Sequence, residues 1–361
     1  MNNLAYKMPL TTFNDNNTAK FPRTRYQGSK SKIVDWIIES SNSLEINTIL
    51  DSFGGTGVVG YNFKKLGKKV VYNDIMTFNS MIATAIIENK DTYLSDDEID
   101  ELLYSEANDC PTFIQDNYKK IYYLDEENKW LDEMVYKINK MTDKYKQSIA
   151  WFAVIQSCII KRPYNLFHRA NLYVRTANVK RSFGNKITWD KPFEIYFRQF
   201  VHEANEAIFD NNKENIVLNQ DATNINPKDY GIDTVYIDTP YISAKGVGTD
   251  YYDFYGFLEG MMDYNNWDKK ILSSYKHKPI IGKGNKEWTG KNEIFDSFDK
   301  LFARYKDQQL IISYRNDGVP SISELKEILS KYKSDVYKVS SMDYKYVLST
   351  RKTKEVLIIA K

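Results

Sequence analysis

The sequence predicts an α/β protein with a doubly wound, mostly parallel sheet and an inserted, mainly helical lobe. Two observations lead to this prediction. Short runs of β-branched and apolar residues repeatedly end at a turn or an acidic residue, and helical patterns lie between several of them. Between residues 81 and 214 this alternation stops, and the chain becomes helical and acidic, then apolar, then basic. We therefore expect a sheet domain formed by 1–80 and 215–361, with 81–214 as the lobe.

Seven segments are typical of strands: 48–53, 69–74, 215–221, 233–238, 309–314, 335–341 and 355–360. Helical patterns are clearest over 31–41, 58–67 and 321–332. The last of these begins at Ser321 and carries Glu324 three residues later, which is the spacing of a capping box. Because the connection between the last two strands is too short for a crossover helix, we expect them to pair antiparallel.

The composition is that of a globular protein, with 42% hydrophobic and 27% charged residues among 361. The N-terminal residues lack the apolar core of a signal peptide, and no run of 18 apolar residues occurs, so we expect a cytoplasmic protein without a membrane span. The isolated Cys110 and Cys158 predict neither a disulfide nor a metal site. The three histidines also lack metal-ligand spacing, so we expect no metal.

Charge is segregated along the chain although the formal net charge is only +2. Residues 91–145 contain fifteen acidic and six basic side chains, whereas 161–191 contain eight basic and one acidic. A second basic stretch, 268–291, has seven basic side chains against two acidic. Two basic stretches in a nearly neutral protein predict a polyanion-binding face. Aromatic and amide side chains between the bases of 161–191 favour nucleic acid over a solvated surface.

A glycine-rich turn, Asp-Ser-Phe-Gly-Gly-Thr-Gly-Val-Val-Gly over 51–60, follows the first predicted strand. It satisfies G-x-G-x-x-G, and Asp74 lies where a ribose-binding acid is expected. This pattern alone fits either a nicotinamide dinucleotide or another adenosyl ligand. Asp51, directly before the turn, would repel a pyrophosphate and suits the ammonium of a methionine moiety, which favours S-adenosylmethionine.

Two further motifs accompany this turn. Tyr-Gln-Gly-Ser-Lys occupies 26–30, before the first strand, and Asp-Thr-Pro-Tyr occupies 238–241, after the fourth. In these motifs and their order, nearly the whole chain resembles the Dam-type (D12 class) N6-adenine-specific DNA methyltransferases. The resemblance implies a Rossmann-like methyltransferase sheet, S-adenosyl-L-methionine as cofactor, and a target-recognition lobe over 81–214. It also implies methylation of a flipped adenine N6 at a short site in double-stranded DNA, in a restriction-modification or related system.

The resemblance assigns catalysis to Asp238, Thr239, Pro240 and Tyr241. Asp238 and the Thr239 carbonyl would accept hydrogen bonds from the adenine amine, and Tyr241 would stack on the base. Thr239 departs from the family, which usually has proline there, and leaves the backbone less restricted. The cofactor-binding residues implied are Tyr26, Gly28, Lys30, Asp51, Phe53, Gly54, Gly55, Thr56, Gly57, Asp74, Asp221 and Ala222.

The basic stretch 161–191, near the end of the lobe, is the part of the chain that we expect to contact DNA. The residues predicted to do so are Lys161, Arg162, Asn165, His168, Arg169, Arg175, Lys180, Arg181, Asn185 and Lys186. The aromatic cluster 251–257 is either a flap over the extrahelical strand or core. A restriction endonuclease acting separately is an expected partner, and the DNA substrate implies association with the nucleoid.

Other functions remain open from the sequence. RNA adenine or cytosine N4 as the target would fit the same motifs. An NAD-dependent dehydrogenase would leave 26–30 and 238–241 without a role, and a non-catalytic DNA-binding protein is favoured only by Thr239.

Overall fold

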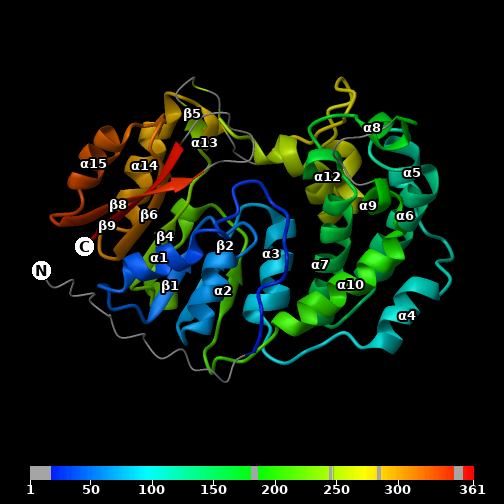
Figure 1. The fold of residues 1–361 in the computed structure, drawn as a ribbon, viewed down its shortest axis with the longest axis horizontal. Helices are drawn as coiled ribbons and strands as arrows, with labels where there is room; N and C mark the ends of the chain where they lie inside the picture. The colour runs from blue at the N-terminus through cyan, green and yellow to red at the C-terminus, as the bar shows by residue number, and fades with distance from the viewer. Residues whose placement is uncertain (1–17, 180–185, 244–245, 247, 283–285, 345–352) are drawn as a thin grey trace, which may run out of the picture.

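The computed structural model describes residues 18–179, 186–243, 246, 248–282, 286–344 and 353–361. A seven-stranded sheet forms one half of the molecule (Figure 1). In sheet order its strands are β3 (Ile216–Leu218), β2 (Lys69–Asn73), β1 (Thr48–Asp51), β4 (Thr234–Ile237), β6 (Gln309–Arg315), β9 (Thr353–Ala360) and β8 (Val336–Tyr344). Each of the seven predicted strands is present.

The strand directions confirm the predicted fold class. The pairs β3–β2, β2–β1, β1–β4 and β4–β6 are parallel. Strand β9 pairs antiparallel with both β6 and β8, as expected for two strands joined by a short connection. A separate two-stranded ladder of β5 (Ile242–Ser243) and β7 (Gly318–Val319) was not predicted, because two residues are too few to show a period.

Alternate residues of each strand enter opposite cores, as the pleat requires. Ile49, Val70 and Ile311 pack on one face, and their neighbours Leu50, Val71 and Ile312 pack on the other. The first face is covered by α1 (Val34–Ser41), α2 (Val58–Lys65) and α3 (Thr77–Ala83), and the second by α14 (Glu293–Arg304), α15 (Ile322–Ser330) and η3 (Ala222–Asn224). The short helix α11 (Pro227–Tyr230) precedes β4. Helix α15 begins with the predicted Ser321–Glu324 capping box.

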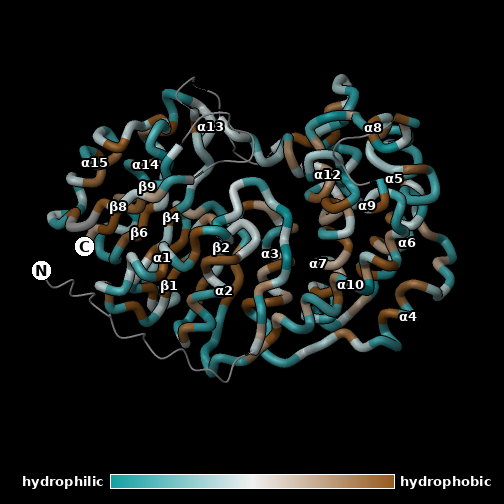
Figure 2. Tube along the Cα trace, viewed as in Figure 1, coloured by the Kyte–Doolittle hydropathy of each residue, from teal (hydrophilic) through white to brown (hydrophobic). Residues whose placement is uncertain are grey.

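A helical lobe follows α3 through a π-helical segment, Thr84–Glu88. Its helices are α4 (Asp96–Tyr104), α5 (Phe113–Asn117), α6 (Asp125–Asn139), α7 (Lys144–Ile160), α8 (Leu172–Thr176), α9 (Lys186–Asp190) and α10 (Phe193–Ala207), with a short 3-10 turn at Pro163–Asn165. Helix α7 is buried from Ser148 to Ile160 and packs on α10 and α3, so it joins the lobe to the sheet domain. Hydrophobic residues concentrate along the strands and along α7 (Figure 2). No helix in the described ranges is long and apolar enough to cross a membrane.

A later segment also packs on the lobe. Helix α12 (Tyr251–Met262) and the 3-10 helix η4 (Tyr264–Lys269) lie beside α5–α8 (Figure 1). The Trp267 ring lies 5.0 Å from that of Tyr118, and Phe257 stacks on Phe167 at 5.3 Å. The aromatic cluster 251–257 is therefore helical, and its buried members form core rather than a flap. The predicted boundary placed this segment in the sheet domain, although its aromatic residues pack on helices of the lobe. The short helix α13 (Lys286–Thr289) leads back to α14.

Candidate active site

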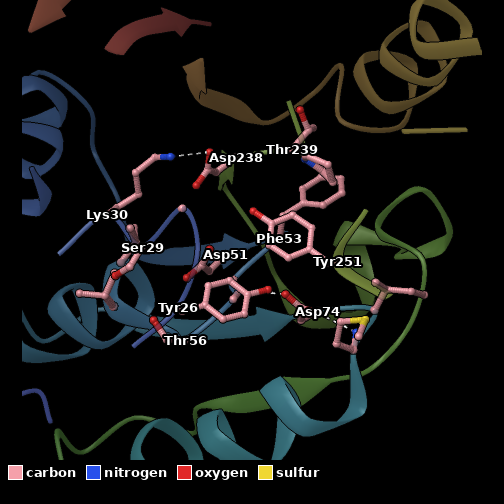
Figure 3. Close-up of a pocket in the computed structure, with 18 of the residues that line it drawn as sticks. Tyr26, Ser29, Lys30, Asp51, Phe53, Thr56, Asp74, Asp238, Thr239 and Tyr251 are labelled. Atoms are coloured by element: carbon pink, nitrogen blue, oxygen red, sulfur yellow. Dashed lines mark hydrogen bonds and ion pairs between the residues drawn. The ribbon is translucent and has the colours of Figure 1, made fainter. Parts of the chain in front are cut away.

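The carboxyl ends of β1, β2 and β4 bring three acidic residues to one pocket. Asp51 is the last residue of β1, and Asp74 and Asp238 directly follow β2 and β4. The connections from β1 and β4 lead to opposite sides of the sheet, and ligands of such folds bind in the crevice at this switch point. Figure 3 shows the pocket with Lys30, Asp51, Asp74 and Asp238 around it. Its wall includes the predicted residues Tyr26, Gly28, Lys30, Asp51, Phe53, Gly54, Gly55, Thr56, Asp74, Asp238, Thr239, Pro240 and Tyr241.

The glycine-rich turn holds the pocket floor close to the sheet. A Cβ at Gly54 would lie 2.1 Å from the buried ring of Tyr72, so only glycine fits there. Gly57 caps α2 with a φ of 79°, a left-handed conformation that favours glycine. The Gly55 amide donates to Asp74 Oδ2 at 2.8 Å, which ties the turn to the end of β2. The backbone can therefore approach a ligand closely.

Asp51 carries a buried oxygen that is available to a ligand. Its Oδ2 accepts a hydrogen bond from the Gly60 amide at 2.9 Å, whereas Oδ1 has no hydrogen-bond partner among the described residues. Burial raises the pKa of this carboxyl to about 7, and the charges of Asp238 and Asp74 contribute in the same direction. An unpaired buried carboxylate is costly, so the site favours a cationic ligand group.

Asp74 lies at the other end of the pocket, beside a stack of tyrosines. Its two oxygens accept from the Gly55 and Met76 amides, and burial raises its pKa to about 6. The Tyr26 ring lies 5.5 Å from that of Tyr251 and 4.9 Å from that of Tyr255, each with an interplanar angle of 11°, and the latter two rings are 6.4 Å apart. This stack joins the first motif to α12 and closes one side of the pocket.

The remaining side of the pocket contains a cluster of polar groups around Asp238. Lys30 Nζ lies 2.8 Å from Asp238 Oδ1, 2.8 Å from the Tyr241 hydroxyl and 3.4 Å from Glu355 Oε1. The Tyr241 hydroxyl also donates to Asp238 Oδ1. Both contacts to Asp238 fall on Oδ1, so Oδ2 is the oxygen that they leave for a substrate. The resemblance counted Lys30 among the cofactor-binding residues, whereas here its ammonium is held at the Asp238 carboxylate.

Burial raises the pKa of Asp238, and Glu355 raises it further, while Lys30 and Tyr241 lower it. Thr239 follows with a side chain only 3% exposed, and its Oγ1 has no hydrogen-bond partner in the described ranges. The Tyr241 ring packs edge-on against Tyr314 at 5.6 Å. The cluster therefore combines a buried acceptor, a fixed ammonium and an oriented aromatic ring.

A second, adjacent hollow contains the last two of the predicted cofactor-binding residues. Asp221 and Ala222 line it together with Phe53 and Pro240, which also line the main pocket. Asp221 Oδ1 accepts from the amide and the hydroxyl of Thr223, so this residue caps η3 as well as lining the hollow. Gly57, which was also predicted to bind the cofactor, does not line the pocket and instead forms the N-cap of α2.

Three predicted DNA contacts lie inside the lobe. Lys161, Arg162 and Arg175 are 1%, 1% and 4% exposed. Lys161 and Arg175 pair with the carboxylate of Glu127 at 2.8 and 2.7 Å. The Arg162 guanidinium donates to the backbone oxygens of Leu166, Tyr122 and Arg169 and to the side chain of Asn171. Their charged groups are used within the lobe, so this structure does not present these three side chains to a phosphate.

The other predicted DNA contacts divide into two groups. Arg169 and Lys186 are exposed, and Asn165 and His168 are half-buried. Burial lowers the pKa of His168, and the charge of Arg169 adds to that effect. Lys180, Arg181 and Asn185 lie outside the described residues.

Sequence reasoning missed several residues of the pocket wall. These are Ser29, Val58, Val59, Ile75, Met76, Tyr236, Tyr251 and Tyr252. It also missed Glu355, which is fully buried beside Lys30 and Tyr241. A lone glutamate before the apolar run of β9 was the available signal. Within the described ranges, no group of three or more His, Cys, Asp or Glu side chains could hold a metal ion.

The fold and the pocket together define a class of α/β enzyme that binds its ligand at the switch point of a doubly wound sheet. A family model for D12 class N6 adenine-specific DNA methyltransferases matches residues 26–311. The chain belongs to this family, and it methylates adenine N6 in DNA with a methyl donor. The matched region contains the glycine-rich turn, the lobe and the Asp238–Tyr241 motif.

Curated relatives cover most of the chain. It is 28% identical over 321 residues to the type II methyltransferase M2.HphI of Haemophilus parahaemolyticus, covering 87% of this chain and 89% of that protein. It is 23% identical to M.NlaIII of Neisseria lactamica, covering 85% and 88%. Identity to M.FokI of Planomicrobium okeanokoites is 25%, covering 91% of this chain and 50% of that longer protein.

Proposed function

We propose that this protein uses S-adenosyl-L-methionine to methylate a flipped adenine at a short DNA site, as the modification enzyme of a type II restriction-modification system. The observation that carries the proposal is the shared pocket. It places an unpaired carboxylate oxygen of Asp51 and the Asp238 cluster around the same space. The Asp51 oxygen is suited to a cationic cofactor, and the Asp238 cluster is suited to an amine substrate.

The residues present fit S-adenosylmethionine. Asp51 Oδ1 would accept from the ammonium of its methionine moiety. Asp74 would accept from the ribose hydroxyls, and the hollow beside Asp221 would take the adenine. When bound, the cofactor supplies an activated methyl group on a sulfonium. A dinucleotide fits less well, because its pyrophosphate would lie near the buried acid of Asp51.

The substrate amine is a poor nucleophile, because its lone pair is delocalised into the adenine ring. Asp238 Oδ2 and the Thr239 carbonyl would accept hydrogen bonds from its two N–H groups and favour a tetrahedral nitrogen. The same acceptors would stabilise the positive charge that develops on N6. Tyr241 would stack on the flipped base, with its hydroxyl held by Lys30 and Asp238.

The DNA face that we propose comprises Asn165, His168, Arg169 and Lys186, with Lys180, Arg181 and Asn185 retained as predictions from the sequence. Removing one phosphate interaction should reduce the slope of log K against log salt by about 0.9. Arg169→Ala should therefore weaken DNA binding and flatten its salt dependence without lowering the melting temperature. An unchanged slope in a fluorescence titration with duplex DNA would remove Arg169 from this face.

We further propose that a separate cognate restriction endonuclease recognises the same site, as the type II relatives suggest. A DNA substrate places the activity with the nucleoid in the cytoplasm.

Expression in a host without adenine methylation tests the proposed function directly. Plasmid from that host would be sequenced by a method that reports modified bases, with Asp238→Ala as the control variant. N6-methyladenine at one short motif, absent with the variant, is the expected result. Unmodified plasmid from folded protein that binds S-adenosylmethionine would contradict it and favour RNA or a non-catalytic role. N4-methylcytosine would contradict the proposed target atom.

A further inference from the structure

Glu355 is a fully buried carboxylate in a strand whose later residues, Val356 to Ala360, are all apolar and buried. A buried charge is costly unless it is paired and hydrogen-bonded. Such groups concentrate at functional sites, where their charge affects a neighbour. The position of Glu355 on β9, beside the carboxyl end of β6, brings it to the catalytic edge of the sheet.

Three groups converge on one oxygen of Glu355. Its Oε1 accepts from the Ser313 hydroxyl at 2.6 Å and lies 3.4 Å from Lys30 Nζ. It also lies 3.0 Å from the Tyr241 hydroxyl oxygen, whose single proton can be donated to Glu355 or to Asp238. Lys30 and Tyr241 are the two residues that contact Asp238 Oδ1. Glu355 is therefore connected to Asp238 through both of them.

The charges in this cluster do not cancel when Glu355 and Asp238 are both ionised. Lys30 paired with Asp238 alone would form a neutral pair, and the carboxylate would direct much of its charge toward the ammonium. With Glu355 sharing the same ammonium, the three groups keep a net negative charge. More of the negative charge of Asp238 then remains for a donor in the pocket.

We propose that Glu355 is a positioning residue for methyl transfer, sharing Lys30 with Asp238 and holding the Tyr241 hydroxyl so that Asp238 stays a strong acceptor. This inference rests on the proposed catalytic role of Asp238. Glu355 itself does not contact the substrate, and the Ser313 hydroxyl donates to the same oxygen that faces Lys30 and Tyr241.

The pH dependence of the rate distinguishes this role from simple support of the fold. The groups that face Asp238 are Lys30 before α1, Asp51 at the end of β1, Tyr236 on β4, Tyr241 after β4 and Glu355 on β9. The charge of Glu355 raises the pKa of Asp238, so neutralising it should lower that pKa. The acidic limb of the rate profile should then move to lower pH while the maximal rate falls.

The experiment compares Glu355→Gln with the wild type in single-turnover methylation of plasmid DNA from a host without adenine methylation, across a range of pH. Calorimetry would measure S-adenosylmethionine binding. We expect a rate loss on the order of tenfold to a hundredfold, smaller than for a group that contacts the amine. The cofactor Kd should be unchanged, and the acidic limb should shift to lower pH. Glu327→Gln, the same change on the exposed surface of α15, should behave as the wild type.

An unchanged rate for Glu355→Gln, a slower rate with an unmoved acidic limb, or a slower rate due to weaker cofactor binding would overturn the inference. Failure of the wild type to methylate DNA, or an active Asp238→Asn variant, would instead contradict the proposed function. Should Glu355→Gln not fold, Ser313→Ala decides the question. It should slow methyl transfer severalfold at unchanged cofactor affinity, and a wild-type rate would overturn the inference.

Discussion

Lys30 and Asp238 form a 2.8 Å ion pair that joins the motif before α1 to the first residue after β4. Their side chains are 3% and 16% exposed, so the more accessible partner is the carboxylate. Both the Lys30 ammonium and the Tyr241 hydroxyl contact Oδ1, which leaves Oδ2 as the acceptor for a substrate. This arrangement orients the proposed catalytic acceptor before any substrate binds.

Replacing Asp238 by Asn should abolish methyl transfer while preserving cofactor binding. Loss of the charged acceptor should cost at least about a hundredfold to a thousandfold in rate. Burial raises the pKa of Asp238, so the wild-type rate should fall as pH decreases through that pKa and the carboxylate becomes protonated. Single-turnover rates over a pH series check both points. A variant with a wild-type rate, or a wild-type rate that rises toward acid, would contradict the assigned role.

Asp51→Asn should weaken cofactor binding yet stabilise the protein without ligand. The folded state raises the pKa of this carboxyl from 3.8 to about 7, so it binds more protons than the unfolded chain between these values. Stability therefore falls as pH rises from about 4 to about 7, and the penalty persists above 7. At pH 8 the variant should gain up to a few kcal/mol. Thermal unfolding measures this gain, and a lower melting temperature at pH 8 would refute it.

The Asp51→Asn variant also tests whether the Asp51 carboxylate binds the cofactor. Because the carboxylate must be ionised to accept from an ammonium, the wild-type affinity for S-adenosylhomocysteine should weaken as pH falls below about 7. The variant should bind S-adenosylhomocysteine more weakly, and its affinity should lack the pH dependence that ionisation of Asp51 causes in the wild type. Calorimetric titrations at pH 5.5 and 8 compare the two proteins. Equal affinities of the wild type and the variant at pH 8 would show that Asp51 does not bind the ammonium.

Thr239→Val should retain methyl transfer. The proposed acceptor is the backbone carbonyl, which valine keeps, and the Oγ1 that it removes is buried without a partner among the described residues. Removing an unsatisfied buried hydroxyl should leave stability unchanged or raise it by about 1–2 kcal/mol. Steady-state kinetics and chemical denaturation measure the two effects. A large loss of rate in a stable variant would show that the hydroxyl contacts substrate.

Glu127→Gln should destabilise the lobe. The change leaves Lys161 and Arg175 buried beside a neutral amide, and breaking a buried pair in this way costs about 3–5 kcal/mol. Asp190→Asn is the matched control, because its pair with Lys186 is exposed at 4.0 Å and should be worth less than about 1 kcal/mol. Urea denaturation of both variants checks the contrast. Similar destabilisation of the two would show that the buried cluster does not stabilise the lobe.

The sheet was predictable because its strands are short apolar runs bounded by polar residues, and their order restricts the topology. The Ser321–Glu324 box likewise located the start of α15. The return of α12 to the lobe was not predictable. Its aromatic residues are spaced for a buried helix, but their partners, such as Tyr118 and Phe167, lie far away in sequence.

The residues of the site also divide into those that local sequence predicts and those whose role depends on contacts with distant residues. Local motifs located Asp51, Asp74 and Asp238, because each comes at or after the end of a strand. Positive charge alone could not separate Arg169 from Arg175, since an identical side chain serves an exposed surface or a buried pair depending on a distant Glu127. Glu355 was missed for a related reason, because its proposed role depends on contacts with β6 and with the two loops that hold Lys30 and Tyr241.

Whether Asp238 serves methyl transfer to adenine N6 is tested most directly by the identity of the modified nucleoside after one turnover. The wild type would be compared with Asp238→Asn. Purified protein, labelled S-adenosylmethionine and unmethylated plasmid would react, and the digested DNA would be separated by chromatography. We expect label in N6-methyldeoxyadenosine for the wild type only, with equal cofactor binding by both proteins. Label in a cytosine nucleoside, or the same product from the variant, would contradict it.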